Sequence, residues 1–574
     1  MKRAWRLAGP QALVVVLVAL LAVLLVYPVA LTVRSGFAPS PGRPGGFTFE
    51  HVGLVFRDPT LVAGLVNSLK IACATTALCL VIALPLSVFA ARYRFPGKGL
   101  FNAAILVPMI LPPFVGAIGM RAIVGREGVL NTLLGTEWDL LGQARFWGIV
   151  CVEALHLYPI IYLNATAALA NLDPALDEAG ENLGAGPWRR LIRLTLPLVR
   201  PGIFAGGTIV FIWSFTELGT PLMFDYYRAT PVQIFFGLRE MQSSPRPYAL
   251  TVVLLGVSIT SYVLGRLVFG RRGHAMYAKA SRAGGERELG VLAGWGVTAL
   301  FAGVTLLAVL PHVGVVLTSL ARPGSWQGTL LPQALTGAHF ETALGGGDSF
   351  RSIVNSLAYS SMAMGVDLAL GLVIAYTIVR TRAWGRSLLD AMCMVPLAVP
   401  GLVMAFGYAA MTLEWPFASG GPLEGVVGVF GTNPNPIPLL VAAYAVRRLP
   451  YIVRSCVAGL EQTSGELEEA AMSLGASRLR AVRSVTVPLI AANMIAGGLL
   501  VFSFSMLEVS DSLVLAQRLE HSPVTKAIWD FSNRLGDGMY IASAMGVWGM
   551  ALLTATLVGA SLMMGKRLGA IFRA

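Results

Sequence analysis

Residues 468–488 read EEAAMSLGASRLRAVRSVTVP, a short polar and basic stretch between two long apolar runs. Its landmarks are Glu469, Gly475 six residues later, and Pro488 thirteen residues after the glycine. The same spacing occurs earlier in the chain, at Glu178, Gly184 and Pro197. A spaced pattern that occurs twice indicates an internal repeat, and this one divides the chain into two comparable halves.

The composition is that of a membrane protein with many spans. Of the 574 residues, 55% are hydrophobic and only 13% are charged, and the mean hydropathy is +0.70. Soluble domains carry about 25% charged residues, and apolar runs of about 20 residues match the hydrocarbon thickness of a bilayer. The net charge of +13 is expected from Lys and Arg in cytoplasmic loops, so it does not indicate a nucleic-acid partner. The five cysteines lie in apolar runs without a CxxC spacing and are interpreted as buried hydrophobic residues.

The apolar runs predict an all-α polytopic membrane protein with about 12 transmembrane helices. Residues 1–270 are expected to form the first repeat of six helices, residues 271–289 a basic cytoplasmic linker, and residues 290–574 the second repeat. Six is an even number, so both halves face the same way, as two parallel repeats. The first apolar run, residues 12–33, is longer than the core of a signal peptide and is predicted to be retained as a helix.

The repeated pattern lies within residues 173–197 and 463–488, which we call the first and second repeated segments. Acidic residues precede each glycine and arginines follow it, which predicts two short helices with a bend at the glycine. Neither segment is apolar enough to span a bilayer. A basic amphipathic helix lying among lipid headgroups is one interpretation of a single copy. Two copies with the same spacing favour a surface on which a partner docks.

The repeated segments resemble the EAA loop of bacterial ABC importer permeases, in which EAA is followed by Gly and then Pro. The second segment reads Glu469-Ala470-Ala471, and the first departs from the pattern with Gly180 in place of the second alanine. In that family the loop is the coupling helix that fits a cleft in the ATP-binding subunit. The resemblance implies that the coupling residues are Glu178, Ala179, Gly184, Pro197, Glu469, Ala470, Ala471, Gly475 and Pro488.

The presence of two such repeats in one chain is similar to the iron(III) permease family and its relatives for thiamine and 2-aminoethylphosphonate. The resemblance implies the transmembrane component of an ATP-driven importer that forms the translocation path. Iron(III) is the first expectation for its substrate, and 2-aminoethylphosphonate, thiamine or another small organic solute are alternatives. Two copies of a cytoplasmic ATP-binding subunit and a periplasmic or extracellular solute-binding protein are the implied partners, besides membrane lipid.

The sequence contains no catalytic set, no metal-ligand spacing and no cofactor motif. It also lacks the GxxxxGK[ST] pattern of a phosphate-binding loop, so ATP hydrolysis is expected on a separate subunit. The excess of Lys and Arg in alternate loops predicts a multi-pass membrane protein with both termini in the cytoplasm. The resemblance implies that this membrane is the bacterial plasma (inner) membrane. An ion-coupled secondary transporter is the alternative class, although such a carrier does not need two matched docking segments.

Charged residues inside apolar runs mark a candidate substrate path. Each such charge costs about 2.5–3.5 kcal/mol at a helix centre and usually faces an interior. Glu217 and Glu508 occupy matching places in the two halves, and Asp511 follows Glu508 by one turn. Acidic groups near an outer mouth would attract a cation. Hydrated groups at the membrane interface, or structural helix ends, are the alternatives.

Arg447 and Arg448 lie in another apolar run and have no basic pair at the matching place in the first half. Interior arginines would attract an anion or a metal–anion complex, whereas ion pairs with Glu153 or Asp367 would only hold the helices together. Prolines in both halves are expected either to open the backbone where it lines a cavity or only to kink the helices: Pro108, Pro112, Pro396 and Pro400.

Overall fold

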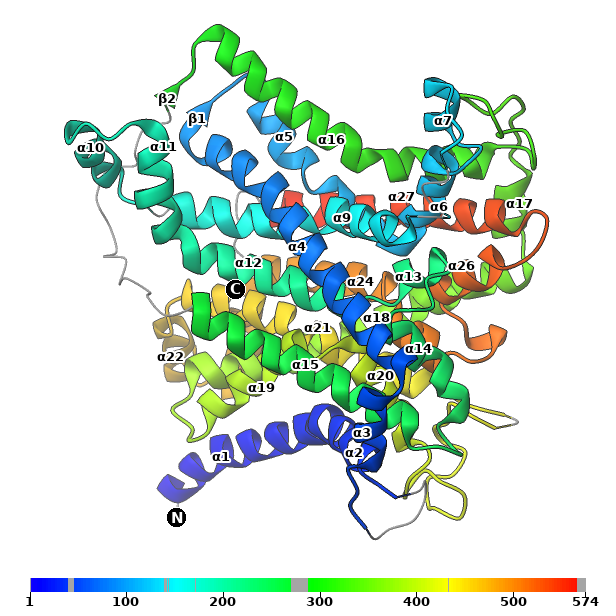
Figure 1. Ribbon diagram of the computed structural model, residues 1–574. Helices are drawn as coiled ribbons and strands as arrows, with labels where there is room; N and C mark the ends of the chain where they lie inside the picture. Colours follow the sequence, from blue (N-terminus) through cyan, green and yellow to red (C-terminus); the bar gives the residue numbers. More distant parts are fainter. Residues whose placement is uncertain are drawn as a thin grey trace. The chain divides into compact units, whose positions relative to one another are not determined.

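The computed structural model describes residues 2–39, 46–138, 142, 144–170, 172–269, 287–431 and 433–564. These residues are mostly helical (Figure 1). Among them, one two-stranded parallel sheet joins β1 (Tyr93–Arg94) to β2 (Arg287–Glu288). Most of the predicted linker, residues 271–286, lies outside the described residues.

The first half contains α1 (Lys2–Leu21), a π turn (Ala22–Val26), α2 (Tyr27–Gly36), α3 (Glu50–Arg57), α4 (Pro59–Arg92), α5 (Lys98–Ala104), a 3-10 turn (Val107–Ile110), α6 (Pro113–Val124), α7 (Val129–Leu134), α9 (Arg145–Ala170), α10 (Pro174–Asn182), α11 (Pro187–Arg190), a π turn (Leu191–Thr195), α12 (Leu196–Phe215), α13 (Gly219–Met223), α14 (Thr230–Gly237), a 3-10 turn (Leu238–Glu240) and α15 (Arg246–Phe269).

The second half contains α16 (Val291–Leu320), α17 (Ala338–Leu344), α18 (Gly347–Arg380), α19 (Arg386–Ala398), α20 (Gly401–Met411), α21 (Ile437–Glu461), α22 (Glu466–Ser473), α23 (Arg478–Ala481), a π turn (Val482–Thr486), α24 (Val487–Met506), α25 (Ser510–Leu515), a 3-10 turn (Leu519–His521), α26 (Val524–Ser532) and α27 (Gly538–Met564).

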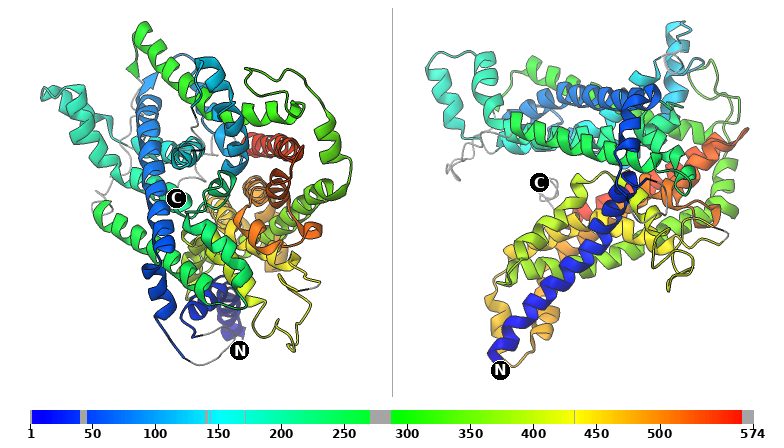
Figure 2. Two further views of the ribbon diagram at one scale, coloured as in Figure 1. Left: turned by 45° about the vertical axis from the view of Figure 1, so that its right-hand side comes forward. Right: turned by 60° about the horizontal axis from the view of Figure 1, so that its bottom comes forward.

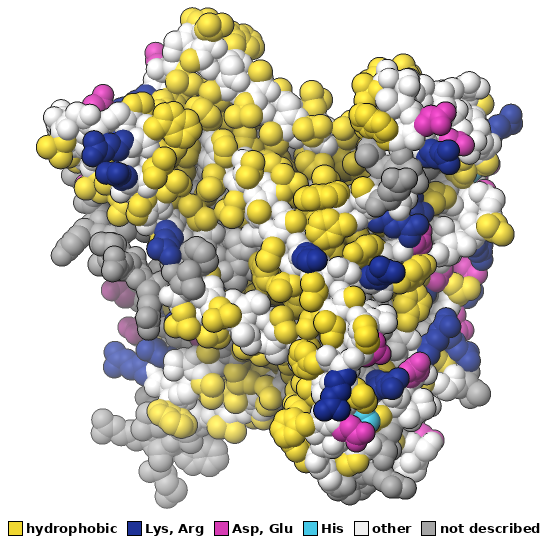
Figure 3. Space-filling model, viewed as in Figure 1, with side chains coloured by type: hydrophobic (Ala, Val, Ile, Leu, Met, Phe, Trp, Pro, Cys, Tyr) yellow, Lys and Arg dark blue, Asp and Glu magenta, His cyan; other side chains and the backbone are white. Residues whose placement is uncertain are grey.

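The predicted set of about 12 membrane helices is confirmed. Nine helices in the described part of the chain are long and apolar enough to cross a membrane, and two bent helix pairs bring the number to eleven. The one predicted helix outside this set is the tenth, α21, which has 25 residues and carries Arg447, Arg448 and Arg454. Much of the surface visible in Figure 3 is hydrophobic, as expected of a surface that faces lipid.

The third predicted span of each half is broken rather than continuous. The pair Lys98–Ile110 and Pro113–Leu134 bends by 97°, and the pair Arg386–Ala398 and Gly401–Met411 bends by 103°. Prolines cause both breaks, because the residue before a proline is pushed out of the α conformation. Leu111 before Pro112 and Val399 before Pro400 are accordingly extended. Pro112 and Pro400 therefore interrupt the third spans, whereas Pro396 lies inside α19. That the interrupted backbone lines a cavity stays a prediction.

The helices form two compact units that do not follow the two sequence halves. Unit 1 contains the described residues of 1–61, 233–255 and 338–571, and unit 2 those of 62–232 and 256–337. In unit 1, α1 packs on α19 and α2 packs on α20 (Figure 2). In unit 2, α16 packs on α6 and α5. Each unit therefore combines the first helix of one half with the broken span of the other half.

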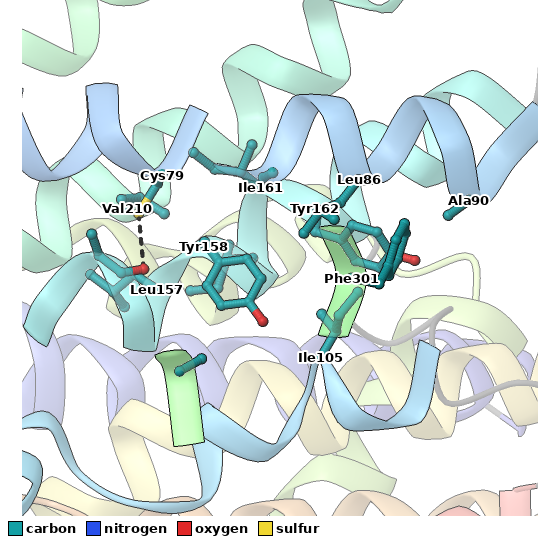
Figure 4. Packing of buried hydrophobic residues seen from close by; sticks show 14 of the residues in the cluster. Cys79, Leu86, Ala90, Ile105, Leu157, Tyr158, Ile161, Tyr162, Val210 and Phe301 are labelled. Atoms are coloured by element: carbon teal, nitrogen blue, oxygen red, sulfur yellow. Dashed lines mark hydrogen bonds between the residues drawn. The ribbon is translucent and has the colours of Figure 1, made fainter. Parts of the chain in front are cut away.

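The apolar core of unit 2 illustrates this exchange. Tyr158 and Tyr162 of α9 and Leu86 of α4 lie in one buried cluster with Phe301 of α16 (Figure 4). The Cys79 thiol also lies there and donates to the Ala154 carbonyl at 3.5 Å. The first helix of the second half is thus part of the core that the first half builds.

Two glycines allow the exchanged helices to approach closely. A Cβ at Gly119 of α6 would overlap the Pro311 carbonyl oxygen of α16 and lie 2.7 Å from the Val315 nitrogen. A Cβ at Gly407 of α20 would lie 2.5 Å from the Pro28 carbonyl oxygen of α2. Small residues at such crossings let the backbones of membrane helices pack directly.

We therefore expect Gly119→Ala to lower stability by about 1–3 kcal/mol, because the added methyl group must separate α6 from α16. The thermal midpoint of unfolding in detergent checks this. Gly303→Ala on α16 is the matched control, because a Cβ there meets nothing within 4 Å. Equal midpoints for the two variants would contradict the close contact.

Candidate coupling segments and a buried charged cluster

Both repeated segments contain the predicted bend at glycine. In the first segment α10 ends before Gly184, which has a φ of +76°, and α11 follows. In the second segment α22 ends before Gly475, which has a φ of +92°, and α23 follows. Glycine adopts this left-handed backbone without the steric cost that other residues carry.

The short helix after each glycine is not separate from the next membrane span, contrary to the prediction. It continues through a π turn into a single helix, Pro187–Phe215 in the first half and Arg478–Met506 in the second. Pro197 and Pro488 each follow that π turn directly, as the second residue of α12 and α24. Proline lacks an amide N–H and clashes with the carbonyl one turn earlier, so the wider turn accommodates it.

An acidic residue that the sequence analysis did not select anchors the first segment within unit 2. Asp177 of α10 lies 3.5 Å from Arg92 Nη1 at the end of α4. The same arginine donates to the Thr195 hydroxyl at 2.7 Å, on the helix that follows the bend. Asp173 caps α10 by accepting from the Ala175 amide at 2.9 Å. These contacts hold both arms of the segment to the end of the second span.

The matching residues anchor the second segment within unit 1. Glu468 is buried and accepts from the Tyr376 hydroxyl at 2.8 Å and from the Thr486 hydroxyl at 2.7 Å. Arg380 at the end of α18 lies 3.6 Å from Glu468 and donates to the Thr463 carbonyl at 2.7 Å. An acid, an arginine and a threonine thus recur at aligned positions. Alignment of the two halves could have identified these three residues from the sequence. The EAA pattern instead favoured the neighbouring glutamates, Glu178 and Glu469.

The glutamates of the EAA pattern face away from these anchors. Glu178 and Glu469 are both exposed. Large apolar side chains beside the bends are exposed as well, with Leu183 at 87% and Leu474 at 91% of their full exposure. Each segment therefore has an anchored face and an open face with acidic and apolar groups. A surface of that composition suits contact with another protein.

Glu468→Gln is expected to loosen the second segment, because it removes the charge from hydrogen bonds that are each worth about 1.5–3 kcal/mol. Amide hydrogen exchange across residues 466–481 should accelerate about tenfold. Glu469→Gln changes the exposed neighbouring glutamate and should leave exchange as it is in the unmodified protein. Equal exchange in the two variants would contradict the anchor.

Four of the five charges selected for a substrate path form one cluster in unit 1. Arg447 Nη1 of α21 lies 2.5 Å from Glu508 Oε1 and 3.3 Å from Asp511 Oδ2. Arg448 Nη2 lies 2.5 Å from Glu508 Oε2 and donates to the Phe504 carbonyl at 3.1 Å. The acidic side chains are only 4% and 0% exposed, whereas those of the arginines are 19% and 12% exposed. The cluster ties α21 to the end of α24 and to α25.

This geometry corrects two alternatives from the sequence. The described ion pairs of Arg447 and Arg448 are with Glu508 and Asp511, rather than with Glu153 or Asp367. Glu508 is buried, so it is not a hydrated group at an interface. Sixty residues or more of chain separate these arginines from Glu508, so no local sequence pattern reveals the ion pairs.

The fifth charge, Glu217 in unit 2, lies in a different setting. Its Oε1 accepts from the amides of Gly219 and Thr220 at 3.2 and 3.3 Å, at the start of α13. These contacts of Glu217 are those of a structural residue at a helix end, which was one of the alternatives from the sequence. Position 156, which aligns with Arg447, holds a histidine whose Nδ1 lies 2.8 Å from the Pro108 carbonyl oxygen. The charged cluster of the second half is not repeated by the same residues in the first half.

A helical chain with two membrane-spanning repeats, each with an anchored helix–glycine–helix segment, has the architecture of a transport permease. It belongs to the family of binding-protein-dependent transport system inner membrane components, whose model matches residues 83–274 and 367–561. Each match contains one repeated segment. Family membership shows that the chain is an ABC permease and not an ion-coupled carrier. The chain is therefore an inner-membrane transport component.

Three relatives illustrate the range of the family. The chain is 25% identical over 489 residues to the putative ferric transport system permease protein FbpB 1 of Haemophilus influenzae, which covers 82% of this chain and 72% of that protein. It is 26% identical over 457 residues to the probable ABC transporter permease protein y4fN of Sinorhizobium fredii, which covers 78% of each. It is 33% identical over 176 residues to the molybdenum transport system permease protein ModB of Escherichia coli, which covers 30% of this chain and 74% of that protein.

Proposed function

We propose that this permease imports iron(III). The observation that carries the proposal is the similarity to a relative named as a ferric permease, which extends over 82% of this chain and therefore over both repeats. The molybdenum permease matches 74% of its own length but only 30% of this chain, so that match cannot extend over both repeats in full. Among the described residues, no group of three or more His, Cys, Asp or Glu could hold a metal ion.

The repeated segments are the proposed docking sites for two copies of an ATP-binding subunit. Their exposed glutamates and apolar side chains lie on short helices outside the apolar spans, and their anchors connect them to the spans. Docking there places both segments on the cytoplasmic side, with both termini inside and the solute-binding protein on the outer side. Closure of the ATP-binding subunits would then shift the equilibrium between conformations of the permease.

The charged cluster is the proposed lining of part of the substrate path. Burial covers Glu508 and Asp511, so a passing solute would meet the partly exposed edges of Arg447 and Arg448. Guanidinium groups recognise carboxylates and other oxyanions, which favours cargo that travels as an anion or as a metal–anion complex. Glu217, which is half-buried, is the proposed contribution of the first half.

Uptake into proteoliposomes tests the proposal. The chain is reconstituted with its ATP-binding subunit, and the binding protein is supplied outside with radioactive iron(III), molybdate, 2-aminoethylphosphonate or thiamine. ATP-dependent accumulation of iron is the expected result. Accumulation of another solute but not of iron would refute the substrate and leave the permease class intact. Failure of all four would contradict the list of substrates, whereas uptake without the ATP-binding subunit would contradict the proposed energy coupling.

A further inference from the structure

The two repeated segments differ at many aligned positions, and three of these lie close together in space. Gly180, Glu181 and Arg190 of the first segment correspond to Ala471, Met472 and Ala481 of the second. The first segment thus has a larger side chain on its second helix and no side chain on the facing glycine. A Cβ at Gly180 would lie 3.4 Å from Arg190 Cδ, at van der Waals distance, so the arginine stem lies directly beside this position. The departure from the EAA pattern and the extra arginine are therefore neighbours in the structure.

Arg190 crosses the bend and joins the two helices of the first segment. Its Nη1 forms an ion pair with Glu181, and its Nε lies 3.9 Å from Asp177. The side chain of Arg190 is only 10% exposed. The second segment has no acid or arginine at the positions of Glu181 and Arg190, so it cannot form this ion pair.

A second arginine reaches the same acids from outside the first half. Arg287 Nη2 lies 3.2 Å from Glu181 Oε2 and 3.7 Å from Asp177 Oδ2. Hydrogen bonds from Arg190 and then Arg287 lower the pKa of Glu181, so its carboxylate stays charged at neutral pH. Arg287 also borders a pocket of about 170 Å³ that the first segment lines with Asp177 and Glu178.

The backbone fixes the origin of Arg287. Arg287 and Glu288 form β2, which pairs in parallel with β1 directly after α4. Three residues later Val291 begins α16, the helix that the second half contributes to unit 2. The side chain that touches the first segment is therefore attached to the start of α16 by a short, paired strand.

We propose that Arg287 is a positioning residue that ties the first repeated segment to the start of α16. The two segments are consequently held differently: the first by its anchor and by a network of two arginines that reaches α16, and the second by its anchor and by Arg478, whose Nε donates to the Tyr376 hydroxyl at 3.2 Å. A movement of the first segment on docking would be passed to α16 directly. The inference rests on the proposed docking of the ATP-binding subunits at these segments.

Hydrogen exchange on the purified full chain tests the network without any partner. Arg287→Gln should accelerate amide exchange across residues 174–190 about two- to fivefold, the range expected for partly exposed ion pairs. Exchange across residues 466–481 should not change. Glu181→Gln should have a larger effect, because Glu181 pairs with Arg190 as well as with Arg287. Adding Arg287→Gln to it should produce a smaller change than Arg287→Gln alone, because the contact between Arg287 and Glu181 is already lost and only that with Asp177 remains. Glu288→Gln, on the adjacent residue of β2, is the control.

Coupling is measured in proteoliposomes with the ATP-binding subunit and a transported solute. Arg287→Gln should lower the amount of solute imported per ATP hydrolysed by at least twofold, and Glu288→Gln should not. Unchanged exchange at residues 174–190 would overturn the network, and faster exchange with an unchanged ratio would overturn its positioning role. The exchange result does not depend on docking, so its failure is distinguishable from failure of the proposed function.

Discussion

Gly475→Val should reduce uptake about tenfold or more while the protein still inserts and the ATP-binding subunits still hydrolyse ATP. The φ of +92° at Gly475 is strained for any residue with a Cβ and is worst for a β-branched one. Such strain costs about 1–3 kcal/mol, and 1.4 kcal/mol corresponds to a factor of ten. A Cβ at this position meets nothing within 4 Å, so the effect acts through the backbone. Relief of the strain would turn α22 relative to α23 and misdirect the exposed Leu474.

Two companion variants separate the backbone from the surface. Gly475→Asn should retain most of the uptake, because asparagine tolerates the left-handed conformation far better than valine. Glu469→Arg leaves the backbone alone but reverses an exposed charge, so it should also separate ATP hydrolysis from uptake. Measured uptake of solute and hydrolysis of ATP in the same proteoliposomes give both quantities. Normal uptake in Gly475→Val and Glu469→Arg would contradict docking at the second segment.

The features that the sequence predicted correctly are those with local causes. A left-handed turn needs glycine, so Gly184 and Gly475 marked the bends. Extended backbone precedes proline, so Pro112 and Pro400 were among the four prolines expected to open or kink the helices, and both lie at the breaks in the third spans. The apolar length of each helix marked the spans, and the doubled spacing marked the repeat.

The features that the sequence did not predict depend on which helices become neighbours. All the spans have similar hydropathy, so hydropathy cannot predict which helices pack together. The contacts of α16 with α6 and of α2 with α20 are therefore visible only in the structure. Gly119 and Gly407 were aligned between the halves, yet only the packing shows the carbonyls that they face. The partners of Arg447 and Arg448 were missed for the same reason, since 60 or more residues separate them from Glu508.

Removal of Glu508 should cause the largest loss of stability among single changes in the charged cluster. Glu508→Ala takes away the carboxylate that both arginines share and leaves Arg448 with the Phe504 carbonyl. Breaking a buried ion pair costs about 3–5 kcal/mol, and the partly exposed arginines place the expected loss near the lower limit. The thermal midpoint in detergent should fall by about 5 °C or more. Glu414→Gln is the control, because it loses only the solvent-accessible ion pair with Arg34 and should change the thermal midpoint by little.

Neutralising the whole cluster distinguishes its structural role from a role in the substrate path. A variant with Arg447→Met, Arg448→Met, Glu508→Gln and Asp511→Asn leaves no uncompensated charge, so it should recover most of the stability that Glu508→Ala loses. If the arginines line the path, this stable variant should import iron poorly and with a higher KM. Full import by the variant would contradict the proposed path, and a midpoint as low as that of Glu508→Ala would contradict the cost assigned to unpaired charge. Stability and uptake therefore answer separate questions about the same four side chains.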